Sequence, residues 1–156
     1  MSYLIGYLGG IVINETTYEL IDDPEEICAI FDISKSPFNL RKCLKLITEA
    51  ERQSIRPDIV AEVTNGPGRS SCVVLFGKEH QRLCCIYKLR IALESHGKSS
   101  GLRVYCLVLP IYKYIILLGI TIHKRGEDNL TNDAKQALHE LCKKVVADIK
   151  KEEGIK

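Results

Sequence analysis

Basic side chains are concentrated in the middle of the chain, where they could bind phosphate groups. Residues 69–125 contain ten Lys and Arg but only two acids (Glu79 and Glu94), a net charge of +8, whereas residues 1–68 carry −5 and residues 126–156 carry −1. Lys and Arg bind phosphate oxygens, and His exchanges a proton near neutral pH. The segment therefore indicates a surface for a polyanion, which the overall net charge of +2 conceals.

Strand alternation decides which of these side chains share a face, because successive strand residues point to opposite sides. Three apolar strand segments each carry their polar residues on one side. These residues are Lys88 and Arg90 in the first segment, Arg103 and Tyr105 in the second, and Gly119, Thr121 and His123 in the third. If the apolar sides all meet the helices, the charged and aromatic members form one solvated cationic face.

Neighbouring loops add further basic residues to this predicted face, namely His96, Lys98, Lys124 and Arg125. Such a face would bind phosphates through Lys and Arg, stack a base on Tyr105 and move a proton through His123. The alternative is the ordinary polar outer side of a half-buried sheet, which needs no ligand. The scarcity of acids in this segment favours a ligand.

These residues depend on a predicted antiparallel sheet with strands at 72–76, 82–93, 102–109 and 114–123, all rich in Val, Ile, Leu and Tyr. Before it, apolar residues at helical spacing predict a helix from Pro37 to about residue 52. A weaker helix over residues 59–63 follows after Pro57. Thr131 caps a final helix, whose apolar stripe extends to residue 149.

At the N-terminus, Gly9-Gly10 separates two β-prone runs, Tyr3–Leu8 and Ile11–Leu20, which predicts a hairpin. Asp22–Glu26 then has the composition of a short helix start. The sequence thus predicts an α+β fold in which two helices pack on a small antiparallel sheet with a C-terminal helix. We expect this domain over residues 31–156 and an N-terminal extension over residues 1–30.

Several classes of protein are disfavoured. Met1–Gly10 lacks the basic region and cleavage site of a signal peptide, and the most apolar stretch, Leu102–Ile122, contains charged residues and a proline.

Seven cysteines without a CxxC pair are typical of reduced thiols, so we expect a cytoplasmic protein. Adjacent Cys84 and Cys85 would point to opposite faces, which disfavours a zinc site. Gly66–Ser71 lacks the Lys of a P-loop. We expect no metal and no cofactor.

Four stretches in this order carry a resemblance to a known family: Tyr87-Lys88-Leu89-Arg90, then Gly97-Lys98-Ser99-Ser100-Gly101-Leu102-Arg103-Val104-Tyr105, then Ile115–Lys124, and Glu127-Asp128-Asn129-Leu130-Thr131 before the last helix. Together they are similar to the RelE/HigB-type toxins of bacterial type II toxin–antitoxin systems, within the RelE/ParE superfamily. The likeness covers roughly residues 31–145, and the Gly97–Val104 stretch is its most specific part.

The resemblance implies a ribosome-dependent endoribonuclease that cleaves mRNA without a metal and inhibits translation. In that chemistry the ribose 2′-hydroxyl attacks the neighbouring phosphodiester, leaving a 2′,3′-cyclic phosphate and a 5′-hydroxyl. Carried over by position, the catalytic residues are Lys88 or Lys98 as base, His123 as rival base or acid, Arg90 as the partner of Lys88, and Arg103 and Arg125 as clamps on the phosphate. The RNA-binding residues are Tyr105, Lys124 and His96.

The sequence departs from the family pattern in places. Some members use a Tyr near the C-terminus, which residues 127–156 lack, so Tyr105 would replace it or catalysis would depend on His123. The resemblance implies a cognate antitoxin as partner, often of helix-turn-helix type, together with mRNA and the ribosome but no membrane. A homodimer and a toxin–antitoxin hetero-oligomer both stay open. The alternatives are a non-catalytic gyrase inhibitor of ParE type and a repurposed nucleic-acid-binding relative.

Overall fold

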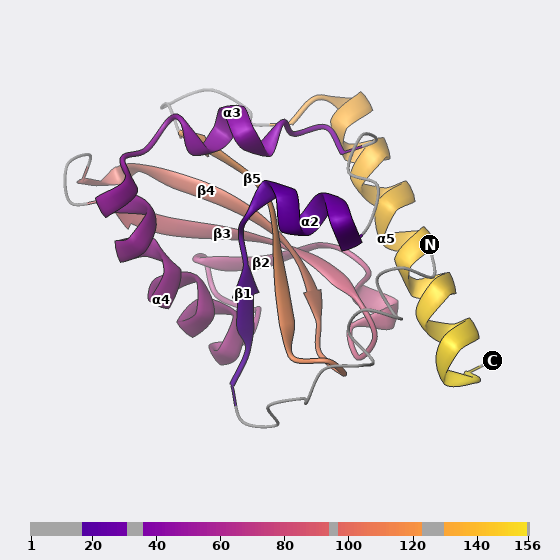
Figure 1. Cartoon of the computed structure of the whole chain (residues 1–156). Coiled ribbons are helices and arrows are strands. Elements are labelled where there is room, and N and C mark those ends of the chain that lie inside the picture. The colour runs from indigo at the N-terminus through magenta and orange to yellow at the C-terminus, as the bar shows by residue number, and fades with distance from the viewer. Residues whose placement is uncertain (1–16, 31–35, 94–96, 123–129, 156) are drawn as a thin grey trace.

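The computed structural model describes residues 17–30, 36–93, 97–122 and 130–155, with only the backbone described for Ile30 and residues 97–100. A sheet lies at the centre with helices around it (Figure 1). The elements in chain order are β1 (Glu19–Ile21), α2 (Pro24–Ile30), α3 (Leu40–Leu44), α4 (Glu49–Asn65), β2 (Cys72–Phe76), a 3-10 turn η1 (Lys78–His80), β3 (Cys85–Leu93), β4 (Gly97–Leu109), β5 (Tyr114–Ile122) and α5 (Asn132–Glu153). The predicted α+β class is confirmed.

The five strands form one mixed sheet in the order β1-β5-β4-β3-β2. Strands β2 to β5 pair antiparallel with their neighbours in sequence, which confirms the predicted meander. Strand β1 lies on the outer side of β5 and runs parallel to it, with Glu19 opposite Tyr114. The prediction of a purely antiparallel sheet is therefore wrong at this edge.

Strand β1 includes the last residues of the predicted N-terminal hairpin, which lie in the part of it that the structure describes. The first arm of that hairpin, Tyr3–Leu8, and most of the second arm, Ile11–Leu20, lie outside the described residues. What the structure does describe joins β5, near the other end of the chain. The short helix predicted after Asp22 is confirmed as α2, where Asp23 Oδ1 accepts a hydrogen bond of 3.0 Å from Glu25 N.

The region between residues 37 and 65 is divided differently from the prediction of a helix over residues 37–52 and a second after Pro57. Helix α3 starts only at Leu40, where Asn39 is the N-cap. A new helix, α4, begins after Thr48 because Thr48 and Glu51 form a capping box. Residues 37–65 therefore contain two helices, as predicted, but α3 is much shorter than expected and α4 begins earlier and is much longer.

Pro57 does not separate two helices but lies inside α4. A proline there removes one backbone donor. The affected carbonyl belongs to the exposed residue Gln53, four positions earlier, so water can satisfy it. Helix α4 continues to Asn65 and buries Ile55, Ile59 and Val63 along one side.

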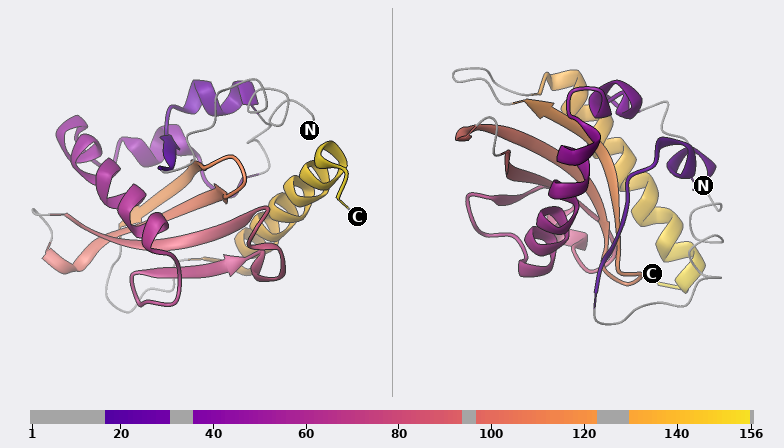
Figure 2. Two further views of the ribbon diagram at one scale, coloured as in Figure 1. Left: turned by 90° about the horizontal axis from the view of Figure 1, so that it is seen from below. Right: turned by 60° about the vertical axis from the view of Figure 1, so that its left-hand side comes forward.

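Helices α4 and α5 lie on opposite sides of the curved sheet, as the right-hand view of Figure 2 shows. Helix α4 contacts β3 and β1, whereas α5 contacts β2 and β3. The predicted cap of α5 is confirmed, because Thr131 Oγ1 accepts a hydrogen bond of 3.1 Å from Ala134 N. Helix α5 also stacks His139 on Phe76, with ring centroids 5.5 Å apart.

Asp22 connects the end of β1 to α4. Arg56 forms an ion pair with its carboxylate, Arg52 Nε lies 3.3 Å from Asp22 Oδ2, and Arg52 Nη2 donates to the Asp22 carbonyl at 3.0 Å. Burial alone would raise the pKa of Asp22, but the two guanidinium groups outweigh it, and the net pKa lies below the usual value. Asp22 is thus a buried charge with its countercharges in place.

Candidate anion-binding face

The strand register brings several predicted site residues into two adjacent rows. Arg90 lies opposite Arg103, which lies opposite Thr121, and Lys88 lies opposite Tyr105, which lies opposite Gly119. Residues that are directly opposite in a sheet point to the same face. We call this side the Arg103 face, defined by Lys88, Arg90, Arg103, Tyr105, Gly119 and Thr121. The predicted sharing of a face by these residues is confirmed.

The exposure of this face differs from the prediction. Arg90 is exposed and Lys88 is half-buried, but Arg103 is only 5% exposed and Tyr105 is 0% exposed. The prediction that Arg103 and Tyr105 point to solvent is therefore wrong. Tyr105 does not offer a free ring surface for a base in this conformation.

Phe38, just before α3, is the physical reason for the burial of Tyr105. The two rings stack with centroids 4.7 Å apart and an interplanar angle of 28°. Gly119 makes room for this contact, because a Cβ atom at that position would lie 2.3 Å from Phe38 Cγ. The absence of a side chain at Gly119 lets the segment before α3 lie directly on the sheet.

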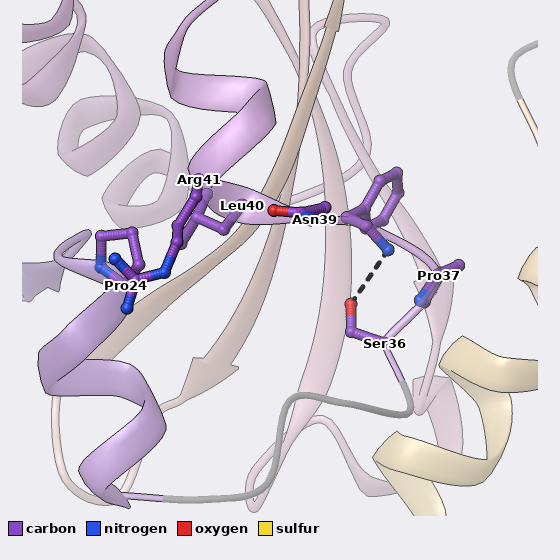
Figure 3. A pocket seen from close by; sticks show the side chains of 7 residues that line it. Pro24, Ser36, Pro37, Asn39, Leu40 and Arg41 are labelled. Carbon is purple, nitrogen blue, oxygen red and sulfur yellow. Dashed lines mark hydrogen bonds between the residues drawn. The ribbon is translucent and has the colours of Figure 1, made fainter.

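The segment that carries Phe38 is fixed by local hydrogen bonds. Ser36 Oγ accepts from the backbone N–H of Phe38 at 3.3 Å, the bond drawn as a dashed line in Figure 3, and Asn39 Oδ1 accepts from Lys42 N at 3.2 Å. A cavity of about 380 Å³ lies beside this segment and reaches Pro24 at the start of α2. Arg41 is the one ionisable side chain in its described lining, so the cavity offers no acid–base pair.

Arg103 is a buried cation for which the described residues provide no carboxylate partner. Among the described residues, none accepts a hydrogen bond from its buried Nη1 atom. Its pKa is lowered, first by burial and then by the positive charge of Arg90. Arg103 therefore has a neighbour that repels it and no described carboxylate that stabilises it, which favours the binding of an anion.

Thr121 belongs to the same row and was not among the predicted site residues. Its Oγ1 atom is buried and makes no hydrogen bond within the part of the chain that the structure describes. Strand alternation already placed Thr121 on the side of His123, so the sequence contained its position. It was missed because a hydroxyl carries no charge. Phe38 was also missed, since no sequence signal shows that it crosses to the sheet.

Five predicted residues cannot be placed by their side chains. His96, His123, Lys124 and Arg125 lie outside the described residues, and Lys98 lies in β4 with only its backbone described. The structure thus brings together Lys88, Arg90, Arg103 and Tyr105 of the predicted set. The catalytic and RNA-binding roles of all nine residues remain predictions.

A second cavity, of about 780 Å³, lies near the turn between β4 and β5. Its lining is Glu79, His80, Arg82, Leu83, Pro110, Ile111, Lys150 and Ile155. Along β4 this turn follows Leu109, whereas Arg103 lies six positions earlier, so the cavity is separate from the Arg103 face. Arg82 in its lining is an exposed cation, which makes it a suitable control residue for Arg103.

The cysteines are free thiols, and most of them are buried. Burial raises the pKa of Cys72 to about 11 and that of Cys85 to about 12, so both thiols are protonated at neutral pH. Within the described ranges, no group of three or more His, Cys, Asp or Glu side chains could hold a metal ion. In the same part of the chain, no helix is both long and apolar enough to cross a membrane.

Comparison with known proteins adds no relative: no family model matches the chain, and no curated protein or solved structure does so either.

Proposed function

We propose that the chain is the toxin of a type II toxin–antitoxin system, a metal-independent mRNA endoribonuclease of the RelE/HigB type that acts on the ribosome. The observation that carries the proposal is the buried cation of Arg103, which has no carboxylate partner among the described residues and lies in line with the exposed Arg90. A phosphodiester would supply the missing negative charge. The resemblance of Gly97–Val104 to the family motif supports the same assignment.

The reaction needs a base for the ribose 2′-hydroxyl, cations for the extra charge on the phosphate and an acid for the leaving 5′-oxygen. Arg103 stabilises the phosphorane-like transition state, and Arg125 is its proposed second clamp. Lys88, half-buried one row away, or Lys98 is the proposed base, with His123 as the alternative. The products are a 2′,3′-cyclic phosphate and a 5′-hydroxyl.

The reaction can be tested with purified protein in a translation extract. We expect codon-associated mRNA cuts only when ribosomes are present, with a 5′-hydroxyl on the downstream fragment. Arg103→Gln should reduce cleavage by about 100-fold, the loss typical for one group that stabilises transition-state charge. The control is Arg82→Gln, which removes an exposed cation from the second cavity and should leave cleavage unchanged. A folded Arg103→Gln protein with full activity would contradict the assignment.

One observation favours a second candidate, a non-catalytic relative that inhibits gyrase or binds nucleic acid. Tyr105 would have to replace the C-terminal Tyr of some family members, yet Phe38 covers its ring. Assays of gyrase inhibition and of RNA binding without cleavage distinguish these cases. Gyrase inhibition without RNA cuts would support the ParE-type activity, and RNA binding alone would support a repurposed relative.

The proposed partner in the cell is a cognate antitoxin, often a helix-turn-helix protein in this family. Its gene is expected next to that of this chain. Co-expression of the neighbouring small gene should suppress growth inhibition by the toxin and yield a co-purifying complex. An isolated gene would weaken the toxin assignment.

A further inference from the structure

We propose that Thr121 is a phosphate-positioning residue: its hydroxyl and the Nη1 atom of Arg103 together bind one phosphoryl group on the Arg103 face. The inference rests on the proposed function for the identity of the substrate, RNA. The binding of a single phosphate can nevertheless be measured without any cleavage.

The geometry supports the pairing of these two groups. Arg103 and Thr121 are direct partners in the β4–β5 register, so their side chains leave the same face of the sheet. Cβ atoms of such partners lie about 5 Å apart. Arg103 Nη1 and Thr121 Oγ1 are both buried without a hydrogen-bond partner in the described part of the chain. Two side chains that are direct neighbours across the strands thus each carry a hydrogen-bond donor without a partner among the described residues.

Unused buried donors are unusual, because each has lost its water without gaining a protein partner. Valine has nearly the shape of threonine and would fill the same place without a polar atom. The hydroxyl of Thr121 is therefore a cost to the unliganded fold. An anion that accepts a hydrogen bond from Thr121 Oγ1 and another from Arg103 Nη1 removes both costs.

The charges of the surroundings select a phosphoryl group over a cation or a neutral ligand. None of the described strand residues that define the Arg103 face is acidic. Arg90 lies on the other side of Arg103 in the same row and lowers its pKa by repulsion. An anion with more than one negative oxygen can interact with both guanidinium groups and with the hydroxyl.

An anion can approach the row from its two flanking residues. Arg103 is buried, but the two residues that flank it are accessible, since Arg90 is exposed and Thr121 is half-buried. The exposed guanidinium of Arg90 can capture a phosphate first. Because Arg103 Nη1 and Thr121 Oγ1 are buried atoms, their side chains must rotate towards Arg90 for the anion to contact both.

The test is a titration with inorganic phosphate at constant ionic strength, followed by calorimetry and by amide NMR shifts. We expect one saturable site, with the shifts centred on β4 and β5. Thr121→Val should weaken phosphate binding at least tenfold, whereas Thr121→Ser, which keeps the hydroxyl, should restore most of the affinity. Thr64→Val is the control, because Thr64 is exposed and its Oγ1 already donates to Val60 O at 2.7 Å.

A structural role for Thr121 would give different results. The proposal expects Thr121→Val to be as stable as the unmodified protein or more stable, because an unpartnered hydroxyl disappears. Unchanged phosphate affinity in folded Thr121→Val, or no saturable binding to the unmodified protein, would overturn the proposal. Failure of the translation assay with phosphate binding intact would overturn the ribonuclease assignment alone. Cleavage without a Thr121 effect on binding would overturn only the role of Thr121.

Discussion

Asp22 and Arg103 are both buried charged residues, but their charged neighbours are opposite in effect. Asp22 is 8% exposed and has two guanidinium partners from α4, which together lower its pKa. Arg103 is 5% exposed, and its nearest charged neighbour in the sheet register is another arginine. The first charge is balanced by neighbouring side chains, whereas no residue that the structure describes balances the second.

The contrast separates structural from functional use of buried charge. A balanced pair connects two elements and is costly to break, since removal of one partner leaves the other uncompensated. An unbalanced cation contributes nothing comparable to folding and is instead ready for an anion. Three predictions test this contrast, in order of decreasing effect on stability.

Asp22→Ala should have the largest effect, a loss of about 2–3 kcal/mol in the free energy of unfolding, because Arg52 and Arg56 lose their countercharge. Urea unfolding followed by circular dichroism measures the loss. Asp23→Ala is the matched control: it removes one exposed capping bond to Glu25 N and should cost about 1 kcal/mol. Equal losses in the two variants would show that the ion pairs contribute nothing beyond a cap.

The pH dependence of stability should reveal Asp22 with a smaller effect. Its folded pKa lies below the unfolded value, which is about 3.9 for Asp. The stabilisation is therefore complete above about pH 4 and is lost as the pH falls through the lower folded pKa. Urea midpoints between pH 7 and pH 2 measure this. In Asp22→Asn, the part of the stability loss at low pH that comes from protonation of Asp22 should be absent. An identical dependence of the urea midpoint on pH in the variant and the unmodified protein would contradict the prediction.

Arg103→Met should have the smallest effect on stability, a change of less than about 1 kcal/mol. The variant keeps an unbranched, flexible but shorter side chain and removes a buried charge that has no described carboxylate partner, so any change should be towards greater stability. Its urea midpoint at low phosphate measures this. A loss as large as that of Asp22→Ala would mean that Arg103 has a stabilising partner in the fold, and the contrast would disappear.

The sequence predicted those elements whose signals are local. The cap at Thr131 and the alternation in β3 to β5 involve residues close in sequence, and the structure confirms both. Pro57 was misjudged because a proline predicts a break, whereas this one lies at an exposed helix position where the missing bond costs little. Apolar residues continue at helical spacing on both sides of Thr48 and predicted one continuous helix. The capping box at Thr48 starts a separate helix there instead.

The sequence could not predict features that depend on distant contacts. Alternation correctly placed Arg103 and Tyr105 on one face with Lys88 and Arg90. It could not show that Phe38, nearly seventy residues earlier, would cover Tyr105. Whether a sheet face is solvated depends on what packs over it, and that information is not contained in the strand itself.

The parallel pairing of β1 with β5 has a consequence for the order of folding. Strands β2 to β5 are joined by short connections, but β1 must wait until residues from the far end of the chain are in place. Such non-local pairing is slow, because the loop is closed before the contact stabilises it. Until β1 arrives, the apolar edge of β5 is open to strands of other molecules, so nascent chains should be prone to aggregation at this edge.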